Sequence, residues 1–154
     1  MTQHLLPGES IMFDIEQSVG FALSKANQRV SAVFKEEFKD YGITPRQFIL
    51  LAILWKTDGL SQIALSKKTD IDRTTIGGII DRLEKAEFLE RRPSPEDRRA
   101  HLVWLTDKGR YLEEDLCRAA NRVRGRIAER ILPGEYKQVK RLLDKLRQGE
   151  MGQR

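Results

Sequence analysis

Apolar residues recur at helical spacing along most of the chain, and one stretch near its middle organises the rest. Between residues 72 and 85, four apolar side chains fall on a single stripe: Ile76, Ile79, Ile80 and Leu83. This is the pattern of a short helix that packs on a small core. Asp72 is a favourable N-cap, and Ile71 before it can pack across the first turn. The pattern therefore predicts a helix that begins at Asp72.

A shorter helical pattern precedes this helix, and an alternating pattern follows it. Ser61 can cap a helix over residues 61–68, and residues 69–71 then form a three-residue turn. Residues 88–92 and 101–105 alternate as strands do, with two prolines between them, which predicts a β-hairpin with a basic tip. A helix-turn-helix followed by such a hairpin is a winged helix.

Long helical patterns begin the chain. Residues 10–41 carry an apolar stripe that ends at Gly42, a typical helix stop. About thirty helical residues reach about 45 Å, more than one small domain covers, so part of this stripe is expected to pack on a second subunit. Thr44, Pro45 and Gln47 predict the capped start of a central apolar helix that ends before Asp58.

Two further helices are expected after the hairpin. Thr106 caps a long helix that ends around residues 131–134, and a last helix reaches Gln148. The predicted fold class is all-α with a small β-hairpin wing. The predicted domains are a winged helix-turn-helix DNA-binding domain at residues 43–106 and a helical dimerisation region formed by residues 1–42 and 107–154.

The segment from Leu60 to Gly109 resembles the DNA-binding domain of the MarR family of bacterial transcriptional regulators. Three pieces carry the resemblance: DRLEK at residues 81–85, Asp97-Arg98-Arg99 in the wing, and LTDKG at residues 105–109. The resemblance implies a homodimeric repressor that a small molecule or an oxidant releases from its operator. We expect a cytoplasmic protein that binds a pseudo-palindromic operator in double-stranded DNA. Gly78 and Glu87 depart from the family pattern, where a larger residue and a helix-ending glycine are usual.

The predicted recognition helix supplies the first candidates for DNA contact. Arg73 and Thr74 are expected to meet base edges, and Thr75 to lie near phosphate, because a helix in the major groove offers its N-terminal turns. Ser61 is a candidate for a contact with the DNA backbone. We interpret Gly77 and Gly78 as lowering the surface that faces the groove; simple tolerance at solvated positions is the alternative.

In the wing, the resemblance implies that Arg99 enters the minor groove, that Asp97 orients it by a salt bridge, and that Arg98 assists at the backbone. A solvated charged hairpin is the alternative. Arg82 is expected to contact phosphate or to pair with wing carboxylates. Arg92 is a further basic candidate on the hairpin.

Composition sets limits but does not identify the partner. The net charge is +5, yet residues 60–105 hold nine basic and eight acidic residues, so DNA binding depends on where the arginines lie. The longest apolar run, FILLAILW, is far too short for a membrane span. Two distant histidines and one cysteine offer no triad and no metal spacing, so we expect neither an enzyme nor a metal or cofactor.

In ligand-responsive relatives the effector pocket lies between the dimerisation helices and the DNA-binding domain. The candidates for such a pocket are Ser24, Asn27, Ser31, Arg46, Phe48 and Trp55. The alternative is that each faces solvent or caps a neighbour. The first helix resembles those of regulators that answer aromatic acids or their coenzyme A thioesters (acyl-CoA). A stripe of arginines could meet thioester phosphates or be a solvated face: Arg118, Arg122, Arg126 and Arg130.

Two alternatives to a ligand-released repressor remain open. One is a winged helix used for protein interaction without DNA binding, against which the basic wing tip argues. The other is an oxidant-sensing repressor that uses Cys117, the only cysteine. Oxidant-sensing members of the family carry their cysteine in the first helix, where this chain has Gly20. We therefore expect Cys117 to be packed and inert.

Overall fold

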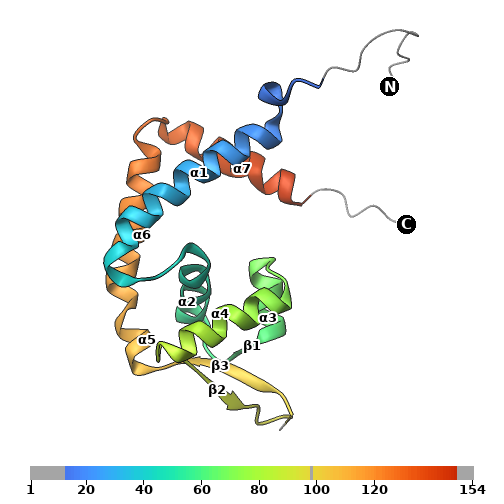
Figure 1. Cartoon of the computed structure of the whole chain (residues 1–154), viewed down its shortest axis with the longest axis vertical. Coiled ribbons are helices and arrows are strands. Elements are labelled where there is room, and N and C mark those ends of the chain that lie inside the picture. Colours follow the sequence, from blue (N-terminus) through green and yellow to red (C-terminus); the bar gives the residue numbers. More distant parts are fainter. Residues whose placement is uncertain (1–12, 98, 149–154) are drawn as a thin grey trace, which may run out of the picture.

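The computed structural model describes residues 13–97 and 99–148 (Figure 1). Its elements are η1 (Ile15–Gln17), α1 (Val19–Phe38), η2 (Lys39–Tyr41), α2 (Pro45–Lys56), β1 (Leu60–Ser61), α3 (Gln62–Thr69), α4 (Arg73–Lys85), β2 (Leu89–Pro93), β3 (His101–Leu105), α5 (Asp107–Tyr111), α6 (Glu113–Ala128) and α7 (Pro133–Arg147). The sheet and hairpin lie at one end of the molecule, and α7 lies at the other (Figure 1). The predicted fold class, mostly helical with a small β wing, is confirmed.

The helix-turn-helix forms where its caps predict. The Asp72 carboxylate accepts from the Thr75 amide at 2.9 Å, and the Ser61 hydroxyl accepts from the Ala64 amide at 3.1 Å. Between the two helices, Asp70 adopts a left-handed conformation with φ of 55°. The predicted stripe of α4 is fully packed: Ile76, Ile79, Ile80 and Leu83 are each at most 2% exposed.

The sheet has three strands, in the order β1-β3-β2, with both pairs antiparallel. The second strand of the predicted hairpin is confirmed at His101–Leu105, and the first, β2 at Leu89–Pro93, lies one residue later than expected. The register pairs Leu89 with Leu105 and Pro93 with His101. The short strand β1, which pairs Ser61 with Leu102, was not predicted. Two residues are too few to show an alternating pattern.

The predicted first helix is interrupted. Residues 10–12 lie outside the described part, and residues 15–17 form a separate turn of 3-10 helix before Ser18, whose ψ of 129° is extended. The side chain of Asp14 accepts from the amide of Glu16 at 3.0 Å. A short polar side chain that bonds local backbone competes with helix formation. Gly42 ends the segment in the left-handed conformation, as predicted, with φ of 63°.

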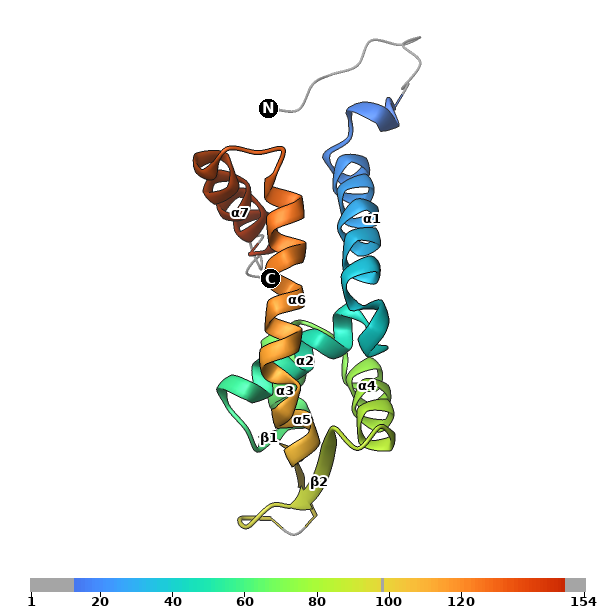
Figure 2. The ribbon, with the colours of Figure 1, turned by 90° about the vertical axis from the view of Figure 1, so that its left-hand side faces the viewer.

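The helix predicted after Thr106 is also interrupted, at Leu112. Thr106 caps α5 as expected, because its hydroxyl accepts from the Gly109 amide at 3.0 Å. The Leu112 amide then bonds to the Arg110 carbonyl, and α6 begins one residue later. Figure 2 shows α6 running alongside α1, so the break separates a short helix on the sheet from a long helix on α1.

The helix α2 links the two parts of the molecule. Its capping box is complete: the Thr44 amide donates to the Gln47 side chain at 2.9 Å, and the Gln47 amide donates to the Thr44 hydroxyl at 3.3 Å. Leu50, Leu51 and Leu54 are fully buried. They belong to one continuous core that also contains side chains of α1, α3, α4, α6 and the sheet. No helix in the described part of the chain is long and apolar enough to cross a bilayer.

Candidate nucleic-acid interface

The first turn of α4 presents an exposed polar edge. Arg73 and Thr74 are exposed, as expected for residues that reach base edges. Thr75 is occupied within the helix: its amide and its hydroxyl both donate to the Asp72 carboxylate, the hydroxyl at 2.7 Å. The hydrogen bond from the Thr75 hydroxyl holds the pKa of that carboxyl below its ordinary value of 3.8. Thr75 thus fixes the start of α4, and Arg73 and Thr74 project from it.

The two glycines of α4 have different surroundings. A Cβ on Gly77 would lie 3.0 Å from the Gln62 amide nitrogen, so this glycine faces α3. A Cβ on Gly78 would meet only the end of Arg82, at 3.9 Å. The missing side chain of Gly77 makes room for Gln62, which is a second reason for glycine at this position besides a low groove-facing surface. The interpretation that both glycines lower a groove-facing surface stays a prediction.

An arginine that the sequence reading missed joins α4 to the wing. Arg91 on β2 forms ion pairs with Glu84 and, at 2.5 Å, with Asp81, and its backbone amide donates to Glu84 at 3.0 Å. Successive side chains of a strand point to opposite faces of the sheet. The Arg91 side chain lies on the face that meets α4, and those of its neighbours Glu90 and Arg92 lie on the other face. The α4-to-wing pairing expected of Arg82 is thus made by Arg91, and Arg82 is exposed.

The hairpin tip is shaped by its own backbone. The Asp97 carboxylate accepts from the Arg99 amide at 2.9 Å, and the Asp97 carbonyl accepts from the Ala100 amide at 2.9 Å. The expected salt bridge from Asp97 to the Arg99 guanidinium is absent among the described contacts, and the Asp97 carboxylate bonds instead to the Arg99 backbone amide. Arg99 is exposed. Arg98 lies outside the described residues.

Near the loop end of the hairpin, the exposed side chain of Arg92 contacts groups of its own chain. It pairs with Glu90, and its guanidinium lies 5.3 Å from the ring centroid of Trp104. The same indole covers Gly59, where a Cβ would lie 2.4 Å from the ring. Gly59 also has φ of +70°, so both the conformation and the space require glycine.

The LTDKG segment joins the wing to the helices above it. A Cβ on Gly109 would lie 2.1 Å from the Phe88 carbonyl oxygen, so α5 approaches the β2 end through a glycine. The Gly109 carbonyl accepts from the Trp55 indole at 3.0 Å. Lys108 donates to the Ala86 carbonyl at 2.9 Å, at the end of α4. This segment therefore binds the recognition helix, α2 and the wing together.

A second site lies between α1 and the start of α2, where a cavity of about 500 Å³ opens. Its lining residues are Ser31, Phe34, Lys35, Phe38, Lys39, Gly42, Ile43, Thr44 and Pro45. The rings of Phe34 and Phe38 stack at 3.8 Å between centroids. Lys35 on the last turn of α1 and Lys39 at the start of η2 are exposed at the cavity. The cavity thus combines an aromatic wall with two cations.

The predicted effector residues are only partly gathered at this cavity. Ser31 lines it, and the ring of Phe48 lies behind it, 5.9 Å from that of Phe34. Trp55 packs on Phe48 at 6.1 Å but donates its indole N–H to Gly109. Ser24, Asn27 and Arg46 are exposed and do not line it. The sequence reading missed the two lysines because exposed lysines on a helix carry no distinctive spacing.

Two arginines of the predicted stripe, Arg122 and Arg126, pair with carboxylates of α1, whereas Arg130 lies beyond the end of α6. Arg122 pairs with Glu37 at 2.8 Å, and Arg126 pairs with Glu36 at 2.7 Å and with Glu37 at 3.1 Å. The hydrogen bonds from Arg122 and then Arg126 lower the pKa of the Glu37 carboxyl from its ordinary 4.5. These pairs hold α6 against α1.

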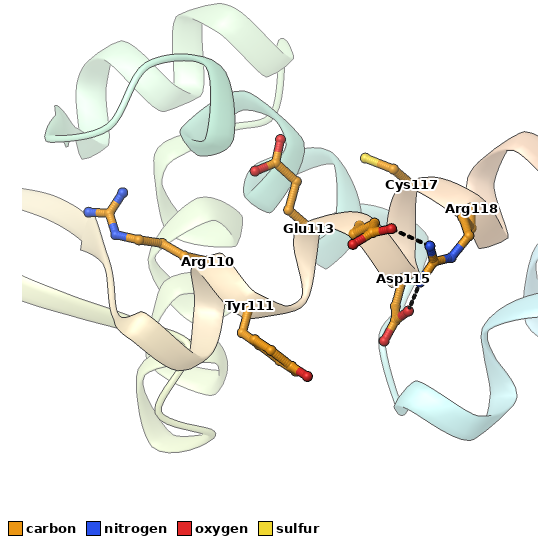
Figure 3. A pocket seen from close by; sticks show the side chains of 7 residues that line it. Arg110, Tyr111, Glu113, Asp115, Cys117 and Arg118 are labelled. Atoms are coloured by element: carbon orange, nitrogen blue, oxygen red, sulfur yellow. Dashed lines mark hydrogen bonds and ion pairs between the residues drawn. The ribbon is translucent and has the colours of Figure 1, made fainter.

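Cys117 lies in a shallow pocket of about 500 Å³ at the start of α6 (Figure 3). Figure 3 shows the Arg118 guanidinium turned toward carboxylates, and Arg118 pairs with Glu114 and, at 2.6 Å, with Asp115. Burial, and then the nearby Glu113 carboxylate, raise the pKa of the Cys117 thiol. These surroundings disfavour the reactive thiolate.

The helix-turn-helix, the three-stranded sheet and the hairpin define a winged-helix DNA-binding protein. A model of the MarR family matches residues 43–101. The HTH-type transcriptional repressor NicR of Pseudomonas putida is 35% identical over 117 residues, which cover 76% of this chain and 74% of NicR. The chain belongs to the MarR family and is a DNA-binding transcriptional regulator.

Two solved structures extend the comparison over nearly the whole chain. BpsR of Bordetella bronchiseptica, whose DNA binding is regulated by 6-hydroxynicotinic acid, is 31% identical with a TM-score of 0.86, over 90% of this chain and 99% of that one. The transcriptional repressor CouR, bound to a 23-mer DNA duplex, is 29% identical with a TM-score of 0.80, over 90% and 99%.

Proposed function

We propose that this regulator is a homodimeric repressor that binds a pseudo-palindromic operator and leaves it when a small aromatic carboxylic acid binds. The observation that carries the DNA-binding part is the exposed edge of Arg73 and Thr74 on a helix tied to the wing. Two such helices enter successive major grooves, and Arg99 of each wing enters a flanking minor groove. Ser61 and Gly78 are proposed to lie on the surface that faces the DNA, and Arg98 is proposed to contact the DNA backbone.

The proposal of a dimer rests on apolar surface that one chain leaves open. Tyr136, Val139 and Leu142 of α7 are 38%, 45% and 46% exposed, and Val19 of α1 is 62% exposed. Both helices lie at the end away from the hairpin (Figure 1). Exposed apolar residues that recur every three or four positions along α7 form one face of that helix, and such a face marks an interaction site. We propose that a second copy covers it, so that residues 1–42 and 107–154 form the dimerisation region.

We propose the cavity between α1 and α2 as the effector site. Phe34 and Phe38 line the cavity with apolar surface for an aromatic ring, and Lys35 and Lys39 offer cations for a carboxylate. The regulation of BpsR by 6-hydroxynicotinic acid supports an acid of this class. Because Arg118, Arg122 and Arg126 already pair with carboxylates, the free acid is favoured over its coenzyme A thioester. Ser31 and Phe48 are proposed to contribute to this site. The other predicted effector residues do not line the cavity and are not part of the proposed site: Ser24, Asn27, Arg46 and Trp55.

Release follows if the acid binds better to a dimer whose DNA-binding domains are wrongly spaced. Its differential affinity for that state sets the loss of operator affinity, and the operator weakens effector binding by the same factor. The cavity lies where α1 joins α2, so a ligand there acts on the connection between the dimerisation helices and the DNA-binding domain. The raised pKa of Cys117 makes oxidant release the weaker alternative.

Release is tested by fluorescence anisotropy with a duplex to which the protein is already bound. We expect 6-hydroxynicotinic acid or another member of a panel of aromatic acids to release the duplex, and coenzyme A thioesters to have less effect. Lys35→Met with Lys39→Met should raise the acid concentration needed by roughly tenfold or more, as for loss of a charge-assisted contact. Lys56→Met, an exposed lysine away from the cavity, is the matched control. Equal release of all three proteins would contradict the assigned site.

A further inference from the structure

The side chain of Gln62 connects the two helices of the helix-turn-helix at the edge proposed to face DNA. Gln62 is the first residue of α3, and its side-chain nitrogen Nε2 donates to the backbone carbonyl of Arg73 at 2.9 Å. Arg73 is in turn the first residue of α4. The bond therefore holds the backbone of the residue that is expected to read bases, while leaving its guanidinium exposed.

Gly77 provides the space for this bond. The Gln62 amide nitrogen lies where a Cβ on Gly77 would approach it to 3.0 Å. That distance is tighter than an ordinary van der Waals contact, so any side chain at this position would push the amide away. Glycine inside a helix is destabilising relative to alanine, and here the missing Cβ has a specific use. Gln62 and Gly77 act as one unit.

The backbone of Gln62 is itself fixed to the sheet. Ser61 precedes it, caps α3 and pairs with Leu102 of β3. Strand β3 also forms one side of the hairpin that carries the wing. Gln62 thus ties the start of α4 to the wing-bearing sheet, and Arg91 ties the second half of α4 to the same sheet through Asp81.

We propose that Gln62 is a positioning residue that fixes the first turn of α4 relative to the wing, and thereby determines how well the protein discriminates its operator from other DNA. The buried stripe of α4 alone does not do this, because apolar packing is non-directional and a hydrogen bond is directional. The inference rests on the proposed role of α4 as the DNA-reading helix. It adds a residue that need not touch the base that it helps to read.

The test uses the full-length protein and a duplex that the wild type selects from a random pool. Affinity for this duplex and for an unselected duplex gives a discrimination ratio. We expect Gln62→Ala and Gln62→Met to lower the ratio by roughly tenfold, the size of one orienting hydrogen bond. Methionine keeps the length of the side chain and lacks the donor, so it separates the bond from packing.

Gly77→Ala supplies the second part of the test. It should lower the ratio about threefold in the wild type, because the amide moves and its bond weakens, and should have no further effect once Gln62 is alanine. Its melting temperature should not fall, since alanine favours the helix. Gly78→Ala, with open space around it, measures that gain in stability by itself.

Several results would overturn the proposal. A Gln62→Met protein with the wild-type ratio would mean that only packing matters. Equal losses on both duplexes would mean that Gln62 contacts phosphate, and independent effects of Gln62→Ala and Gly77→Ala would mean that the two residues do not act together. A wild type that selects no sequence would instead contradict the proposed function, so the two failures are distinguishable.

Discussion

Replacement of Gly109 by alanine tests how α5 is seated against the wing. The new Cβ would lie 2.1 Å from the Phe88 carbonyl oxygen and 3.3 Å from Leu105. The Phe88 carbonyl also accepts from the Thr106 amide at 3.1 Å, so it cannot move without loss. Because the obstacle is backbone rather than the end of a flexible side chain, the structure must shift by about an ångström.

The expected magnitude follows from three effects. Overpacking costs about 3 kcal/mol at this distance, weakening of the Thr106 hydrogen bond about 1 kcal/mol, and the preference of a helix for alanine returns about 1 kcal/mol. The net loss of about 3 kcal/mol corresponds to a fall in melting temperature of roughly 6–12 °C for a domain of this size.

The assay is thermal denaturation monitored by circular dichroism. All proteins are measured at the same concentration, because the melting temperature of a dimer depends on concentration. Tryptophan fluorescence gives a second signal, since the Trp55 indole donates to the Gly109 carbonyl. Gly78→Ala is the matched control and should melt at or above the wild-type temperature. If Gly109→Ala melts like Gly78→Ala, the reasoning about the close approach is refuted.

Three further changes test other parts of the structure. Glu87→Gly should stabilise the protein by about 1 kcal/mol, because Glu87 ends α4 with φ of 64° and its exposed pair with Lys108 is worth little; a lower melting temperature would contradict this. Glu37→Gln should make the free energy of unfolding depend less on pH in the acid range. The hydrogen bond from Arg122 lowers the pKa of Glu37, so its carboxylate stabilises the fold above the ordinary pKa of 4.5 and loses that contribution as pH falls through the lowered pKa. An unchanged acid limb in urea titrations would count against the α1–α6 pair. Arg73→Ala should weaken operator binding by about 1–3 kcal/mol and relax sequence preference in anisotropy measurements, and a uniform loss on all duplexes would make it a phosphate contact.

The caps and apolar stripes that positioned the helix-turn-helix were predictable because they are local. Asp72, Ser61, Thr44 and Thr106 each bond to an amide three residues on, so the spacing alone identifies them. The interruptions of the two long helices were not predictable from periodicity, because an apolar stripe continues across a break. At Leu112 the break lets α5 pack on the sheet while α6 packs on α1.

Contacts between distant segments were the part that the sequence did not indicate. Gln62 reaches Arg73 beside Gly77, whose missing side chain leaves room for it, and a glycine within a helix has several possible causes. Arg91 looked like one of many basic residues on the hairpin until the register placed it against Asp81. Such pairings depend on strand register and helix crossing, which arise from tertiary packing.

Glu87 illustrates a departure from the family pattern that the fold accommodates. The Glu87 amide bonds to the Glu84 carbonyl at 2.9 Å, and the Phe88 amide bonds to the Leu83 carbonyl at 2.9 Å. This is the pair of bonds made when a glycine ends a helix. The departure changes the conformational energy of the α4 end and leaves its position unchanged.

Sequence-specific DNA binding by this regulator can be measured with two duplexes. Fluorescence anisotropy of the protein with the duplex upstream of its own coding region, and with a random duplex, is recorded over a series of salt concentrations. We expect tighter binding to the upstream duplex and a steep fall of affinity with salt, consistent with roughly 6–10 phosphate contacts. Equal affinity for both duplexes, with no duplex selected from a random pool, would contradict sequence-specific binding and favour a winged helix that binds another protein.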